Sequence, residues 1–150
     1  MTCLSRIPIA SIEIRSFAHA TEDSNKVTEA VKHILPMDYT EEVEFKRTNL
    51  KGHYGNSITL FETRMKEAKT IEAFVDSLFS RISVIDKENL LRDISLHVEK
   101  GSLYLRIDKQ AALCGEIKLC TRDPIRVRIR FKKKGTEEIL KACKEFGMLP

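Results

Sequence analysis

Residues 125–132, near the C-terminal end of the chain, alternate apolar and basic side chains at every position. A period of two over eight residues is typical of a β-strand with two unlike faces. Basic groups on one face recur at roughly 6.5 to 7 Å, close to the spacing of successive phosphates along a nucleic-acid strand. They are Arg126, Arg128, Arg130 and Lys132. Like charges repel, so the pattern predicts either a polyanionic partner or acidic side chains on a neighbouring strand.

The positive charge of the chain gathers in its last third. Residues 101–150 hold 12 basic and 6 acidic side chains, whereas residues 1–100 hold 14 and 16. A localised positive field favours an anionic partner that docks on one side, although Lys-rich and Arg-rich surfaces also serve solubility alone.

A length of 150 residues predicts one domain, residues 1–150, with a single core. There is no signal-peptide pattern and no apolar run of about 20 residues, so we expect a soluble, cytoplasmic protein with no membrane partner. The four cysteines, which lack C-x-x-C spacing, are expected to be free thiols that are mostly buried.

Periodicity predicts the order of the elements. Residues 9–20 alternate as a strand, and a helix capped by Asp23 or Ser24 follows and ends at Pro36. Residues 109–122 fit one helical turn near 111–113 and a short extended stretch. The other expected elements are strands at 42–48, 57–62, 96–99 and 103–108, a helix that begins at Thr70 with a further turn capped by Asp86, and a final helix capped by Thr136 and ended by Gly147.

This order, β-α-β-β-α-β-β-β-α, predicts an α+β fold in which helices cover one face of an antiparallel sheet. The polar positions of the strands then line an open face. Basic side chains interleaved with aromatic ones suit RNA, because phosphates take the charge and unstacked bases stack on rings. The predicted RNA-binding residues are Arg126, Arg128, Arg130, Lys132, Arg106, Tyr104, Arg15, Phe17 and His53.

An alternative explains the same strand without RNA. If Glu13, Glu42 or Glu44 lies across from the arginines, the charges form an ion-pair ladder, and the chain is then a protein-interaction or dimerisation domain, with a homodimer as one form. The Gly52–Asn56 segment is also open to two interpretations. Its glycines can project His53 and Tyr54, or can simply close a hairpin.

Catalytic and metal-binding patterns are missing from the sequence. The four histidines show no helical metal-ligand spacing, no cysteine pair fits zinc, and no nucleophile elbow or phosphate loop is present. We therefore expect no enzyme activity, no cofactor and no metal. The polar run Asp108–Gln110 is interpreted as shaping a turn.

Residues 8–23, 52–56, 103–112 and 123–129, read together, resemble an archaeal family labelled exosome-associated RNA-binding proteins. The resemblance runs from about Pro8 to Lys134. It implies a fold similar to the large-subunit ribosomal protein that binds 5S ribosomal RNA, and a role in RNA processing or degradation or in ribosome biogenesis. It also implies single-stranded or structured RNA as partner, with exosome subunits as further candidates. It supplies no catalytic residues.

Overall fold

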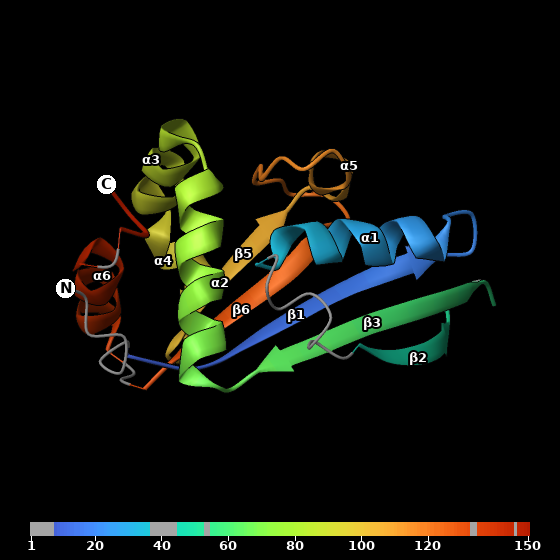
Figure 1. Ribbon diagram of the computed structural model, residues 1–150, viewed down its shortest axis with the longest axis horizontal. Helices are drawn as coiled ribbons and strands as arrows, with labels where there is room; N and C mark the ends of the chain where they lie inside the picture. The colour runs from blue at the N-terminus through green and yellow to red at the C-terminus, as the bar shows by residue number, and fades with distance from the viewer. Residues whose placement is uncertain (1–7, 37–44, 53–54, 133–134, 146) are drawn as a thin grey trace.

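A six-stranded antiparallel sheet forms the centre of the protein, in the order β2-β3-β1-β6-β5-β4 (Figure 1). The structure is a computed structural model that describes residues 8–36, 45–52, 55–132, 135–145 and 147–150. The strands are β1 (Ile9–His19), β2 (Lys46–Lys51), β3 (Ser57–Met65), β4 (Val98–Glu99), β5 (Ser102–Ile107) and β6 (Ile125–Phe131).

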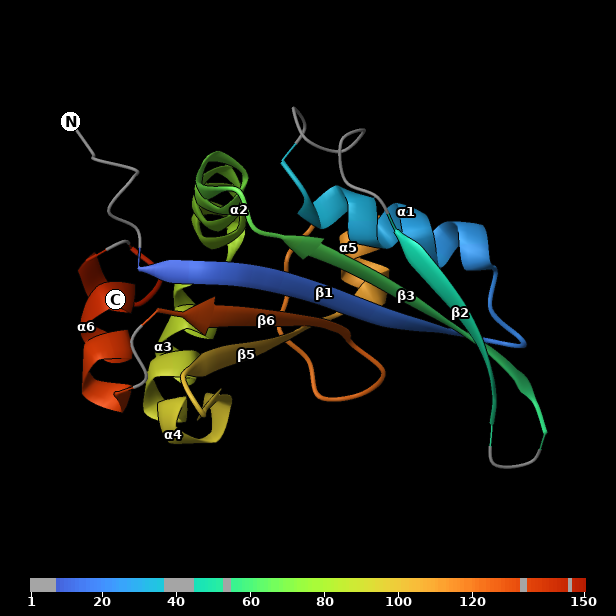
Figure 2. The same ribbon diagram turned by 90° about the horizontal axis from the view of Figure 1, so that it is seen from below.

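The helices lie over one face of this sheet, with α1 and α2 in front of the strands in Figure 1. Seen from below in Figure 2, the middle of β1 and β6 has no helix in front of it. The helices are α1 (Ser24–Ile34), α2 (Ala68–Arg81), α3 (Val84–Arg92), α4 (Ile94–His97), α5 (Lys109–Leu113) and α6 (Thr136–Glu145). The α+β class and the antiparallel sheet are confirmed. The short helices α3 and α5 form where single helical turns were predicted, and α4 is an addition to the predicted order.

The alternating strand near the C-terminus is β6. Its apolar side chains Ile125, Val127, Ile129 and Phe131 are buried in the main core together with residues of β1, β5 and α2. Burial of one face fixes the phase of the strand, because a slip of one residue would place the arginines in the core. The basic positions must therefore face away from the helices.

Helix α1 forms as its sequence predicts. The Asp23 side chain accepts a hydrogen bond from the Asn25 N–H at 2.9 Å and so caps the first turn. Val27, Ala30, Val31 and Ile34 are buried along one stripe of the helix. At the other end of the chain Gly147, with φ of 73°, closes α6 in the left-handed conformation as predicted. Thr136 is the first residue of α6 rather than its predicted cap.

The segment before the second hairpin differs from prediction. Residues 94–97 form helix α4 rather than a strand, and only Val98 and Glu99 pair as β4. The alternation there extends over only four residues, which is too short to separate a strand from a helical turn. The following turn is confirmed, since Lys100 and Gly101 have φ of 51° and 81°.

Two helices also begin at residues other than those predicted. Ser83 caps α3 by accepting a hydrogen bond from the Asp86 N–H at 3.1 Å, so Asp86 lies inside the first turn instead of capping it. Helix α2 begins at Ala68, two residues before Thr70. Strand β2 covers Lys46–Lys51, and residues 42–44 of the predicted strand lie outside the described residues.

The described cysteines are free but are not mostly buried. Cys143 is buried, Cys120 is half-buried and Cys114 is exposed. Burial raises the pKa of the Cys143 thiol to about 12. Cys3 lies outside the described residues, among which no helix has the length and apolar character needed to cross a membrane.

Candidate nucleic-acid interface

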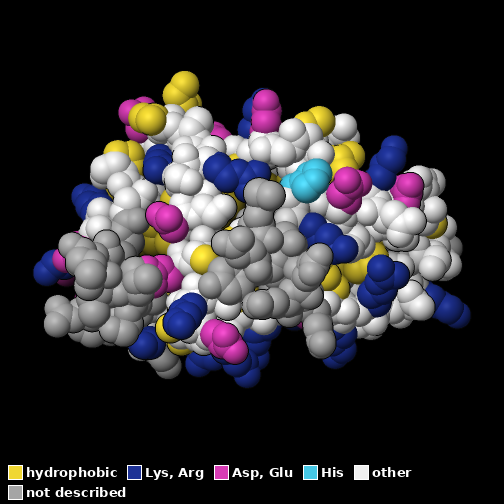
Figure 3. All heavy atoms as spheres, viewed as in Figure 1, with side chains coloured by type: hydrophobic (Ala, Val, Ile, Leu, Met, Phe, Trp, Pro, Cys, Tyr) yellow, Lys and Arg dark blue, Asp and Glu magenta, His cyan; other side chains and the backbone are white. Residues whose placement is uncertain are grey.

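The uncovered side of the sheet, here called the open face, is defined by strand register, because residues opposite each other on paired strands share a face. It carries more than twice as many cations as carboxylates among the described strand positions. The cations are Arg15, Lys46, Arg64, Arg106, Arg126, Arg128 and Arg130, and the carboxylates are Glu13, Glu62 and Glu99. The strip of Lys and Arg along the lower margin of Figure 3 lies toward this side.

Three arginines from three strands stand side by side on the open face. Arg126 of β6 is opposite Arg15 of β1 on one side and opposite Arg106 of β5 on the other. Side chains in such positions are about 5 Å apart at Cβ, and like charges there destabilise a sheet. We call these three residues the arginine row.

Among the described residues, one carboxylate forms an ion pair with the arginine row. Glu62 of β3 accepts from Arg15 Nε at 3.1 Å, and both side chains are partly exposed. Within the described part of the chain, Arg106 and Arg126 have no ion pair and no side-chain hydrogen bond. The centre of the open face therefore holds two guanidinium groups whose donors face solvent.

The neighbouring arginine of β6 is compensated instead. Arg128 lies opposite Glu13, with Nη1 3.7 Å from Oε2, and its Nε donates to Ser102 Oγ at 3.1 Å. Its guanidinium carbon lies 5.8 Å from the ring centroid of Tyr104, within cation–π range. Glu13 also pairs with Arg64 of β3. The ion-pair ladder weighed from sequence thus exists at Glu13, whereas Glu42 and Glu44 lie outside the described residues.

The last two basic positions differ from each other. Arg130 is opposite Ser11 on β1 and Ser102 on β5, so no charge is directly across from it. Lys132 comes one residue after β6, and its backbone N–H donates to the Pro8 carbonyl at 2.9 Å. Both side chains are exposed.

The predicted aromatic residues lie on the open face as well, except His53, which is outside the described residues. Phe17 is half-buried opposite Leu60, and Ile58 and Leu50 continue this apolar strip toward the β2–β3 end. Leu50 is 41% exposed. The open face therefore combines a basic centre with an apolar strip beside it.

A charged cluster that the sequence interpretation missed joins three segments beside the open face. The ammonium of Lys109, at the start of α5, donates to the Phe17 carbonyl, to Asp123 Oδ2 at 2.9 Å and to Glu22 Oε1 at 3.3 Å. His19 Nε2 lies 3.1 Å from Asp123 Oδ1. The Lys109 side chain is only 12% exposed. We call Lys109, His19, Glu22 and Asp123 the lysine cluster.

The lysine cluster holds the ends of β1 and β6 together. Burial alone would raise the pKa of Asp123, but hydrogen bonds and charge from Lys109 and His19 outweigh this and hold it below its ordinary value. Asp123 also has a φ of 43°, a conformation that few non-glycine residues adopt. These contacts indicate that the cluster fixes the turn that leads into β6.

His19, Glu22 and Asp123 place their ligand atoms within 4.8 Å of one another, close enough to surround a cation. The Lys109 ammonium already contacts both carboxylates, so their charge is neutralised from within the chain. His19 and Glu22 are three apart in a turn rather than on a helix, which is why helical spacing did not reveal them. The available signal was that residues 8–23, 103–112 and 123–129 each contribute to the resemblance and each supply one part of the cluster.

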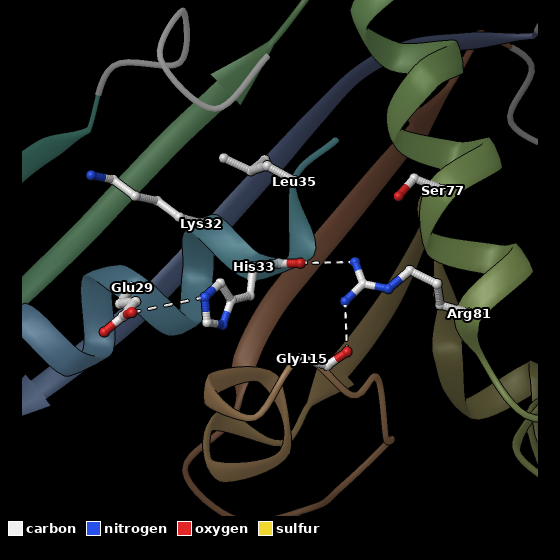
Figure 4. A pocket seen from close by; sticks show the side chains of 7 residues that line it. All are labelled: Glu29, Lys32, His33, Leu35, Ser77, Arg81 and Gly115. Atoms are coloured by element: carbon white, nitrogen blue, oxygen red, sulfur yellow. Dashed lines mark hydrogen bonds and ion pairs between the residues drawn. The ribbon is translucent and has the colours of Figure 1, made fainter. Parts of the chain in front are cut away.

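The helix layer has a hollow of its own, on the other side of the molecule. A cleft of about 660 Å³ lies between α1, α2 and the segment after α5 (Figure 4). Arg81 crosses its floor, donating to the His33 carbonyl at 2.8 Å and the Gly115 carbonyl at 2.9 Å. Basic and acidic side chains are interspersed on this side in Figure 3. Arg81 here ties α2 to its neighbours.

Comparison with known proteins shows the family to which the chain belongs. A family model described as RNA binding matches residues 11–131. The chain belongs to this RNA-binding family. The match covers the sheet from β1 to β6 except for the first two residues of β1, and it includes the arginine row and the lysine cluster.

Relatives of this family come from archaea. The chain is 36% identical over 143 residues to RNA-binding protein PAB1135 of Pyrococcus abyssi, covering 91% of this chain and 92% of that protein. Crystal structures of two DUF54 proteins have the same fold. AF2318 from Archaeoglobus fulgidus is 29% identical with a TM-score of 0.80, covering 92% of this chain and 99% of that one. SSO0741 from Sulfolobus solfataricus is 26% identical with a TM-score of 0.75, covering 92% and 98%.

Proposed function

We propose that the protein binds RNA on the open face, with phosphates at the arginine row and bases against the flanking apolar and aromatic side chains. The observation that carries the proposal is the row itself. Arg126 lies between Arg15 and Arg106, and Glu62 is the only carboxylate paired to the row among the described residues. A phosphate would replace the repulsion between these guanidinium groups with charge-assisted hydrogen bonds.

The surroundings of the arginine row favour single-stranded RNA. Tyr104 and Phe17 flank the row on the same face, and Leu60 and Ile58 extend the apolar surface beyond Phe17. Unstacked bases bind to such aromatic and apolar surfaces, whereas bases inside a duplex are hidden from them. Arg130 lies further along β6 on the same face and can take another phosphate of the same strand.

The test is RNA binding by a neutralised arginine row. Replacing Arg106 and Arg126 with Gln removes two cations that form no ion pair among the described residues. We expect affinity for a 20-nucleotide single-stranded RNA, measured by fluorescence anisotropy, to fall about 10- to 100-fold. The matched control is K26Q/K141Q, which removes two exposed charges from α1 and α6. Equal affinity of the two double variants would contradict the proposal.

We further propose a role in RNA processing or degradation, through association with the exosome, or in ribosome biogenesis. The support is the resemblance of residues 8–134 to the family that carries the exosome label, together with the basic open face. The ribosomal-protein-like fold is part of the same expectation. Purified protein should co-elute with a reconstituted archaeal exosome in size-exclusion chromatography. Separate elution in the presence and absence of RNA would leave the exosome role without support.

A further inference from the structure

A small hollow lies at the edge of the open face, where β5 meets α4 and β4. Its volume is about 180 Å³, and its lining includes Leu96, Glu99, Tyr104, Arg106 and Arg126. This is the space of roughly six liquid water molecules and falls well below the size of pockets that hold drug-sized ligands. The hollow thus has room for a single small ring system.

The hollow begins where the arginine row ends. Arg106 and Arg126 are members of both, so a phosphate bound to the row would place its own nucleotide next to the opening. Tyr104 is the next residue on this face of β5, opposite Arg128. A base attached to that phosphate would therefore lie near the ring of Tyr104, which is two residues from Arg106 along β5.

Two lining residues have no evident structural task. Leu96, in the α4 turn, is 83% exposed, so it contributes almost no core packing. Glu99 is exposed and has no ion pair among the described residues, although Arg106 and Arg126 line the same hollow. An exposed apolar side chain and an unpaired carboxylate are the groups that a nucleobase needs, one against its face and one at its polar edge.

We propose that this hollow binds one unpaired base of the RNA and prefers guanine, an inference that rests on the proposed function. An ionised carboxylate only accepts hydrogen bonds. Guanine presents two adjacent donors, N1–H and N2–H, that match the two oxygens of Glu99. Cytosine and adenine place a ring-nitrogen acceptor beside their amino group, and uracil flanks its single N–H with carbonyls, so each opposes one oxygen of the carboxylate.

The test compares heptauridine RNA with heptamers that carry one central guanosine, adenosine or cytidine. For the unmodified protein we expect the guanosine heptamer to bind at least about fivefold more tightly than the other three, as a good bidentate contact gives. Glu99→Gln should reduce this ratio to below about twofold, because its amide offers a donor where guanine needs an acceptor. Glu145→Gln, an exposed site on α6, is the matched control and should keep the ratio.

The outcomes separate the two proposals. Tight binding that depends on the arginine row but shows no guanine preference, or a preference that persists in Glu99→Gln, would overturn the base site and leave the RNA interface standing. Failure of every heptamer and of the 20-nucleotide RNA to bind would overturn the interface and the base site together.

Discussion

Lys109, at the start of α5, and Arg126, on β6, are two cations of neighbouring segments with opposite surroundings. Lys109 is almost buried and has oxygen partners on three residues from the rest of the chain. Arg126 is exposed between two other arginines. A cation whose partners are all internal stabilises the fold, whereas one left among like charges costs stability and is available to an anion from outside. The contrast predicts that stability and RNA binding can be changed separately.

The largest expected effect is from Arg126→Glu. The new carboxylate would repel phosphate and remove the central cation of the row, so RNA affinity should fall by about 30-fold or more, measured by fluorescence anisotropy. The stability of the fold should increase in the same variant. The introduced carboxylate would lie between Arg15 and Arg106 and convert repulsion to attraction, raising the free energy of unfolding by about 0.5–1 kcal/mol in urea denaturation. A variant that loses binding because it unfolds more easily would contradict the contrast.

Lys109→Met should show the reverse pattern. It leaves Glu22, Asp123 and the Phe17 carbonyl without their shared donor, so the free energy of unfolding should fall by about 1–3 kcal/mol. RNA affinity of the folded variant should stay within about threefold of the unmodified protein. Lys118→Met is the matched control, because Lys118 is 64% exposed and its ion pair among the described residues is with exposed Glu116. Equal stability of the two variants would show that the lysine cluster does not support the fold.

Glu13→Gln tests the intermediate case of a paired arginine. Glu13 compensates Arg128 and Arg64, and its neutralisation should release both guanidinium groups toward RNA phosphates. We expect a two- to fivefold gain in affinity, since one charge is removed at a partly exposed site. A loss of affinity in the same anisotropy assay would mean that the ion pair positions Arg128 for binding rather than competing with RNA.

The smallest expected effect is on the pH dependence of the free energy of unfolding. The pKa of Asp123 is lower in the folded chain than its ordinary value of 3.8, so its stabilising contribution is complete above that value and is lost as pH falls through the folded pKa. Urea denaturation should therefore show the stability difference between unmodified protein and Asp123→Asn shrinking as pH falls from 7 to below about 3.8. A difference that is constant over this range would contradict the pairing with Lys109 and His19.

The sequence predicted the parts of the fold that local periodicity determines. Strand β6 and helix α1 appear where their patterns place them, because burial of one face decides both. The prediction of a strand where α4 forms was wrong, since four residues contain too little periodicity, and the exposed Leu96 follows neither pattern. The basic open face could be inferred from composition and alternation alone.

The neighbours of each arginine could not be predicted. Arg126 and Arg128 have the same sequence context, yet one faces arginines and the other Glu13, because strand order and register are long-range properties. The lysine cluster was missed for the same reason. Asp108 does shape its turn, accepting from the Ala111 N–H at 2.9 Å, but the partners of the adjacent Lys109 are distant in sequence.

The salt dependence of RNA binding tests the arginine row most directly. Each phosphate contact with a cation contributes about 0.7 to the slope of log affinity against log salt for a single strand. The unmodified protein should therefore have a slope steeper by about 1.4 than R106Q/R126Q, while K26Q/K141Q should match the unmodified protein. Parallel slopes for the unmodified protein and R106Q/R126Q would show that the arginine row does not contact RNA phosphates.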